Sequence, residues 1–182
     1  GVDLSIDASV TSADAGGAVR LGDFGNDGTQ LVRNLTVDNL SGTGANGLLT
    51  LGNSFAATTT EVDNAIDFRL VSDIELVQDI SLTTHPDGAD VNAGDDGDVL
   101  FDRTGAITLD SAAGNLLTIT VTDATAGGGN DGDVELPALI GTNNRIGDFV
   151  ISVDTGEIVL GNDGSNASTV NADAITFDGE VV

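Results

Sequence analysis

Clusters of aspartate in the middle of the chain could bind a hard cation such as calcium. Five of them, separated by flexible glycines, lie within twelve residues: Asp87, Asp90, Asp95, Asp96 and Asp98. A smaller cluster follows along the chain: Asn130, Asp131 and Asp133. Carboxylate and amide oxygens are ligands that Ca²⁺ takes in proteins, but the spacing matches neither the EF-hand loop nor the calcium-binding nonapeptide. Calcium is therefore the candidate cofactor, and solvated Asx turns are the simpler interpretation that the residues favour.

A single histidine and the absence of cysteine leave little room for nucleophilic catalysis. His85 lies in Thr83-Thr-His-Pro-Asp-Gly88, where proline and Asp-Gly are typical of a turn. With 30 acidic residues, many carboxylates must lie near one another by chance, so a carboxylate pair does not identify a glycosidase site. The motif Gly42-Thr-Gly-Ala-Asn-Gly47 precedes another alternating run and not a helix, which argues against a dinucleotide site. We therefore expect no catalytic residue.

The charge of the chain excludes two classes of partner. Its 182 residues include 30 acidic and 5 basic side chains, and the formal net charge is −25. Binding to nucleic acid or to an anionic membrane surface depends on cationic side chains that neutralise phosphates. No apolar run approaches the roughly 18 residues that span a bilayer. We expect neither a nucleic-acid partner nor membrane insertion.

The elements that must position these side chains are short β-strands. Apolar residues recur at every second position in many short runs, which is the pattern of half-buried strands. The runs are Leu4–Asp7, Val19–Leu21, Leu35–Asp38, Leu49–Leu51, Ile80–Thr83, Val99–Phe101, Ile107–Asp110, Leu117–Thr122, Val134–Leu136, Ile151–Asp154, Ile158–Leu160 and Ile175–Asp178. Aspartate, asparagine and glycine, which favour turns over helices, lie between the runs. The sequence thus predicts an all-β protein.

Internal repetition indicates how the strands are arranged. An Asx-Asp-Gly motif ends at Gly28, Gly97, Gly132 and Gly164, and the gaps of 69, 35 and 32 residues suit a degenerate unit of about 34. Asp96-Gly-Asp-Val99 also parallels Asp131-Gly-Asp-Val134. Repeated short strands with Asx-Gly corners predict a parallel β-helix (β-solenoid), in which each coil buries its apolar face against the next. The alternative is an antiparallel β-sandwich, with Asx-Gly as hairpin turns.

We expect residues 1–182 to form one solenoid domain, with a less repeat-like region at about residues 57–84. Within that region Ile74-Glu-Leu-Val77 could be helical, although Ile66, Phe68 and Leu70 alternate as in a strand. The chain starts without Met and ends in a strand-like run, which predicts that it is a segment of a longer protein.

Repeat units such as Asp3-Leu-Ser-Ile-Asp-Ala8, Gly17-Ala-Val-Arg-Leu-Gly22 and Asn34-Leu-Thr-Val-Asp38 support a family resemblance. They resemble the repeats of large bacterial surface proteins of the filamentous-haemagglutinin or β-strand-repeat type. That resemblance implies a right-handed β-helix shaft, secretion to the cell exterior, and adhesive or scaffolding work. It carries no catalytic motif over to this chain.

These observations lead to an expected function. We expect a non-enzymatic, secreted or cell-surface structural protein that forms an extracellular matrix, a surface layer or an adhesin shaft. Exposed strand edges favour pairing between chains, so we expect homotypic assembly, assisted by calcium. One alternative is an adhesin module that binds extracellular glycans or proteins through residues 57–84. A second is a polysaccharide-acting β-helix enzyme.

Overall fold

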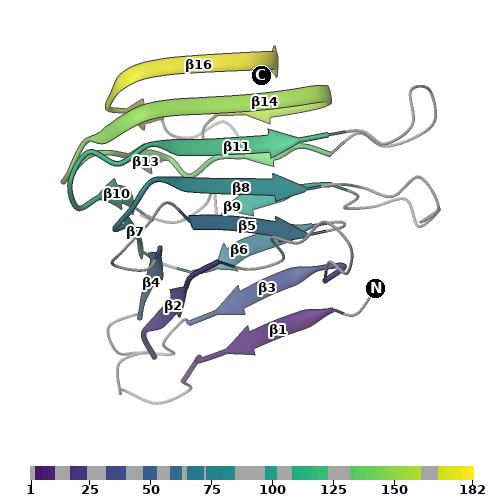
Figure 1. The fold of residues 1–182 in the computed structure, drawn as a ribbon, viewed down its shortest axis with the longest axis vertical. Helices are drawn as coiled ribbons and strands as arrows, with labels where there is room; N and C mark the ends of the chain where they lie inside the picture. Colours follow the sequence, from purple (N-terminus) through teal and green to yellow (C-terminus); the bar gives the residue numbers. More distant parts are fainter. Residues whose placement is uncertain are drawn as a thin grey trace.

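The chain folds as a stack of β-strand coils that rises from the N-terminus to the C-terminus (Figure 1). The computed structural model describes residues 3–10, 17–23, 32–39, 47–52, 58–62, 65–71, 73–84, 97–101, 108–122, 132–160 and 168–182. These residues form strands and no helix, and hence none of them belongs to a helix that could cross a membrane.

Each complete coil has three sides, which we call the first, second and third. The first side consists of β1 (Leu4–Asp7), β3 (Leu35–Asp38), β6 (Ile66–Leu70), β9 (Val99–Phe101), β12 (Val134–Glu135) and the C-terminal part of β14 (Ile146–Val159). The second side consists of β2 (Val19–Leu21), β4 (Leu48–Leu51), β7 (Asp73–Leu76), β10 (Thr108–Ser111), β13 (Leu139–Ile140) and β15 (Thr169–Val170). The third side consists of β5 (Thr58–Val62), β8 (Ile80–Thr84), β11 (Leu117–Val121), the N-terminal part of β14 and most of β16 (Ala172–Val181).

Every strand pair among the described residues is parallel, which confirms the parallel β-helix and excludes the antiparallel sandwich. Along the first side, paired residues lie 31, 31, 33, 35 and 24 positions apart. Four of these five coil lengths are shorter than the expected unit of about 34 residues, and one is slightly longer.

The core is a set of apolar columns that run along the stack axis. On the first side, the buried column consists of Leu35, Ile66, Val99, Val134 and Ile158. Similar columns from the other two sides close the interior, because alternate residues of each strand point inward. Aromatic rings pack between neighbouring coils: the ring centroids of Phe68 and Phe101 are 5.7 Å apart, and those of Phe149 and Phe177 are 5.8 Å apart. Stacking of adjacent coils is what buries these side chains.

The segment 57–84, expected to depart from the repeat, contains β5, β6, β7 and β8, which pair in the same stack. Ile74 lies in β7 with its side chain buried, so the helical alternative for this run is wrong. The alternation of β6 breaks at its end: Leu70 is 43% exposed, because the pairing register with β3 shifts after Asp67. Three strands had no prediction: β5, β13 and β15.

Candidate functional site: carboxylates at the corners of the coils

Acidic side chains link two successive pairs of coils at the corner that precedes the first side. The Asp98 carboxylate accepts a hydrogen bond from the backbone N–H of Asp133, one coil further on, with 2.7 Å between Oδ1 and N. Asp133 repeats the contact, and its Oδ1 accepts the N–H of Glu157 at 2.8 Å. Because paired strands lie about 4.8 Å apart, successive acids form a column along the stack axis. A column of like charges repels itself and attracts cations, and the hydrogen bonds from backbone amides to these carboxylates offset that repulsion.

Glycine lines the same corner. Gly97, Gly132 and Gly156 each precede a member of the acidic column, and Gly97 has a φ of 89°. A Cβ atom on Gly132 would lie 2.5 Å from the backbone carbon of Gly97, and one on Gly156 would lie 2.1 Å from the oxygen of Gly132. These distances are shorter than van der Waals contact, so the Asp-Gly-Asp repeat has a steric reason: the coils approach too closely for a side chain.

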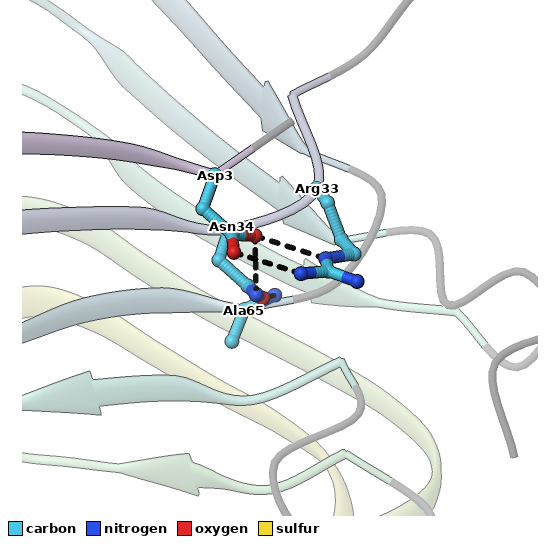
Figure 2. Close-up of polar contacts among 4 residues, drawn as sticks. All are labelled: Asp3, Arg33, Asn34 and Ala65. Atoms are coloured by element: carbon cyan, nitrogen blue, oxygen red, sulfur yellow. Dashed lines mark hydrogen bonds and ion pairs between the residues drawn. The ribbon is translucent and has the colours of Figure 1, made fainter. Parts of the chain in front are cut away.

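The N-terminal end of this corner holds a polar network over three coils (Figure 2). The Arg33 guanidinium donates two hydrogen bonds to Asp3, Nε to Oδ1 at 2.9 Å and Nη2 to Oδ2 at 2.7 Å. Asn34 donates from Nδ2 to Asp3 at 2.9 Å, while its Oδ1 accepts the N–H of Ala65 at 3.1 Å. The Arg33 hydrogen bond is the main cause that lowers the pKa of Asp3 below its ordinary value of 3.8. Asn34 therefore bonds to the coil before it and to the coil after it.

Other corners use the same device. Aspartate oxygens accept backbone N–H groups of the next coil in three further places: Asp23 from Thr59 at 3.0 Å, Asp79 from Leu116 at 2.9 Å, and Asp73 from Thr108 at 3.4 Å, with a shorter bond of 2.8 Å from the Thr108 hydroxyl. Aspartate suits this role because its short side chain spans one strand spacing while its backbone stays in the coil.

Asp110 makes the most extensive of these contacts, and sequence reasoning missed its role. It is only 7% exposed, and its Oδ1 accepts the N–H groups of Asn143 and Asn144 at 3.0 and 3.2 Å. Its Oδ2 accepts the Nδ2–H of Asn143 at 2.8 Å. The Asn-Asn pair follows Asp110 by 33 and 34 residues, about one repeat unit, and that spacing is the signal that could have identified it.

The residues predicted to bind calcium fall into two groups. Asp98 and Asp133 are described, and they lie on adjacent coils with one oxygen of each engaged by a backbone amide. The others lie outside the described residues: Asp87, Asp90, Asp95, Asp96, Asn130 and Asp131, as does His85. Within the described part of the chain, no group of three or more acidic or histidine side chains is arranged to hold a metal ion.

Comparisons with protein-family models, with curated protein sequences and with solved structures find no match to this chain.

Proposed function

We propose that this chain is a non-enzymatic structural protein of the cell exterior, a segment of a matrix, surface layer or adhesin shaft that associates with copies of itself with the help of calcium. The observation that carries the proposal is the use of acidic side chains at successive coil junctions. The carboxylates of Asp98, Asp133 and Asp110 accept backbone amides of the following coil. Such carboxylates suit a stack of many coils, because each coil carries the acceptor for a backbone N–H of the coil that follows it.

The net charge of −25 supports a role for a divalent cation in assembly. Two such molecules repel each other over distances of about a Debye length, roughly 8 Å at physiological salt. Ca²⁺ shared between carboxylates of two copies would offset this repulsion. The resemblance to large bacterial surface proteins supports the extracellular setting, where free calcium is abundant relative to the cytosol.

The test is electron microscopy and sedimentation velocity of the chain in calcium, after chelation, and in an equal concentration of magnesium. We expect filaments or sheets in calcium that dissolve on chelation and do not form in magnesium, because Mg²⁺ gives up its water ligands reluctantly. Isolated particles of one size in all three conditions would refute calcium-assisted assembly.

Two matched double variants separate a calcium effect from simple charge reduction. Asp90→Asn with Asp95→Asn removes two carboxylates from the predicted cluster, and Asp148→Asn with Asp154→Asn removes two exposed carboxylates from the third side. We expect the first pair to abolish assembly in calcium and the second to leave it intact. Equal behaviour of the two pairs would mean that net charge, and not the cluster, controls association.

A further inference from the structure

The third side of the stack differs from the other two sides in its outward-facing residues. Two columns run along its centre. The first column consists of Thr59, Ser81, Thr118, Val150 and Thr176. On the three middle strands the second column consists of Thr83, Thr120 and Ser152. We call these residues the neutral surface, because none of them is charged, whereas Asp67 on the first side and Glu75 on the second side face outward.

The fold does not use the hydroxyl groups of the neutral surface. At the edge of the same side, the Thr122 hydroxyl donates a hydrogen bond to the carbonyl oxygen of Thr84 at 3.1 Å. In contrast, the hydroxyls of Ser81, Thr118 and Thr120 form no hydrogen bond with any described residue. These three side chains are half-buried among their neighbours on the sheet, and their hydrogen-bonding groups are available to a partner.

The neutral surface lies on the most regular sheet of the stack. β5, β8, β11 and the N-terminal part of β14 lie one above another and pair over five residues each without a register shift (Figure 1). On the first side the register shifts between β3 and β6, and β12 pairs over only two residues with each neighbour. A regular sheet presents a flat surface, which a second flat sheet can contact along its whole height.

We propose that the neutral surface packs face to face against the neutral surface of a second copy, with the two stacks side by side and pointing in the same direction. This inference rests on the proposed self-association and names one interface for it. Two copies with a net charge of −25 each can approach most closely where neither presents an acid. An interface on a two-fold axis uses the same residues from both copies. Here the axis runs along the stack between the two columns, so each coil meets the same coil of the other copy.

Charge decides between the two directions in which the stacks could pair. With parallel stacks, Thr118 lies opposite the partner's Thr120, and Asp178, which follows Ser152 in the second column, lies opposite the partner's Thr176. With antiparallel stacks, β5 would lie opposite β16 of the other copy, and Asp178 would come to the position of the partner's Glu61. Like charges that face each other across an interface are unfavourable. The parallel direction avoids this contact.

The interface is small, and its margins are acidic. Five strands high and five residues wide, it covers roughly 400 Å² per copy, against about 800 Å² per partner in a standard interface. At its edge Asp148 lies opposite the partner's Asp154, and both side chains are exposed. The dimer is therefore weak, forms at high protein concentration and is strengthened by salt, which screens the acidic margins.

A charge placed at the centre of the neutral surface should abolish this association. Thr120→Asp adds one carboxylate per copy beside the two-fold axis, and Thr36→Asp adds the same charge at an outward, half-buried position of the first side. Sedimentation equilibrium of concentrated protein in about 1 M sodium chloride, where the screening length is roughly 3 Å, compares them. We expect a dimer of twice 18.2 kDa for the unaltered chain and for Thr36→Asp, and a monomer for Thr120→Asp. Circular dichroism should be the same for all three.

Cysteine variants report the direction of the two stacks, because the chain contains no cysteine. Packed sheets lie about 10 Å apart, a gap that a short bis-maleimide spans. Thr59 and Thr176 lie four strands apart in the first column, or roughly 19 Å. We expect Thr59→Cys and Thr176→Cys each to cross-link to itself. A mixture in which one of the two variants carries an affinity tag should give no mixed product.

The outcomes separate this interface from the proposed function. If Thr120→Asp assembles in calcium as well as Thr36→Asp does, the interface is wrong and self-association stands. Cross-linking of Thr59→Cys to Thr176→Cys would show antiparallel stacks and would overturn the proposal. A monomer in every condition, calcium included, would refute both. Retention of that monomer on cellulose, lost in Thr120→Asp, would assign the neutral surface to an uncharged polysaccharide instead.

Discussion

Replacing Asp110 with alanine should destabilise the stack by about 3 kcal/mol. The carboxylate accepts three hydrogen bonds, at 3.0, 3.2 and 2.8 Å, from the following coil. A hydrogen bond to a charged group contributes about 1.5–3 kcal/mol, but Asn143 and Asn144 are exposed, so water will satisfy part of what they lose. The three hydrogen bonds together therefore contribute less than the sum of their separate values, roughly one full charged hydrogen bond and a fraction of the other two, or about 3 kcal/mol.

Urea unfolding followed by far-UV circular dichroism measures this effect. For a chain of this length, about 3 kcal/mol corresponds to roughly 6–12 °C in the melting temperature. We expect the variant and the unaltered chain to have the same m-value, because both expose the same surface area on unfolding. Asp110→Asn keeps one acceptor oxygen and should cost about half as much. Asp154→Ala, which removes an exposed aspartate, should remain within about 0.5 kcal/mol of the unaltered chain.

Two results would refute this reasoning. The first is an Asp110→Ala variant as stable as Asp154→Ala, which would mean that the corner hydrogen bonds contribute nothing net. The second is an Asp110→Asn variant less stable than Asp110→Ala, which would mean that the shape of the site, and not its acceptor oxygens, controls stability.

Two further predictions concern the same corners. Gly132→Ala should lower the free energy of unfolding by about 3 kcal/mol, because the new Cβ would lie 2.5 Å from the Gly97 backbone. A Cβ at Gly114 meets nothing within 4 Å, so Gly114→Ala should lower it by about 1 kcal/mol, from the φ of +70° alone. The same urea titration compares the two variants. Arg33→Gln should raise the pKa of Asp3 towards 3.8, while the pKa of Asp7, lowered chiefly by its hydrogen bond from the Ser9 hydroxyl, should not move; an NMR titration of the carboxyl carbons reports both. Because these pKa values are lowered in the folded chain, the contacts stabilise it above about pH 3.8, and this contribution is lost as the pH falls further.

The architecture could be predicted from the sequence because burial in a β-helix follows a two-residue period. Val99 and Val134 occupy neighbouring coils at the same register, as their shared Gly-Asp-Val context indicated. A strand whose inward position is polar cannot be recognised from apolar alternation. In β5, which contains three threonines, Thr60 is buried in the core beside Leu82.

A short sequence match does not indicate which side of the coil a strand occupies. Thr104-Gly-Ala-Ile-Thr-Leu109 matches Thr155-Gly-Glu-Ile-Val-Leu160 in sequence, but Leu109 lies on the second side and Leu160 directly follows the first-side part of β14. Strands on all three sides have the same alternating apolar pattern, and corners on all three sides use the same Asx and Gly residues. A short match therefore identifies a strand without identifying its side. The side is identified only by the number of residues in one full coil, and on the first side that number varies from 24 to 35.

The candidate site was less accessible to sequence reasoning than the fold. Asp98 and Asp133 were predicted as metal ligands from the density of acids along the chain, and that density gives no sign of the hydrogen bonds that their carboxylates accept from backbone amides of the next coil. A contact of this kind appears only once the coil length is known locally.

The direction of the hydrogen bonds has a mechanical consequence. The bonds between coils, including the carboxylate links of Asp98 and Asp133, run along the axis of the stack, while the covalent chain winds around it. Tension applied between the two ends therefore loads the coil junctions in series, so that every junction carries the full force. A shaft built in this way should peel one coil at a time from its ends at low force and release roughly 30 residues of slack at each step. It would behave as a yielding tether that absorbs a pull by lengthening.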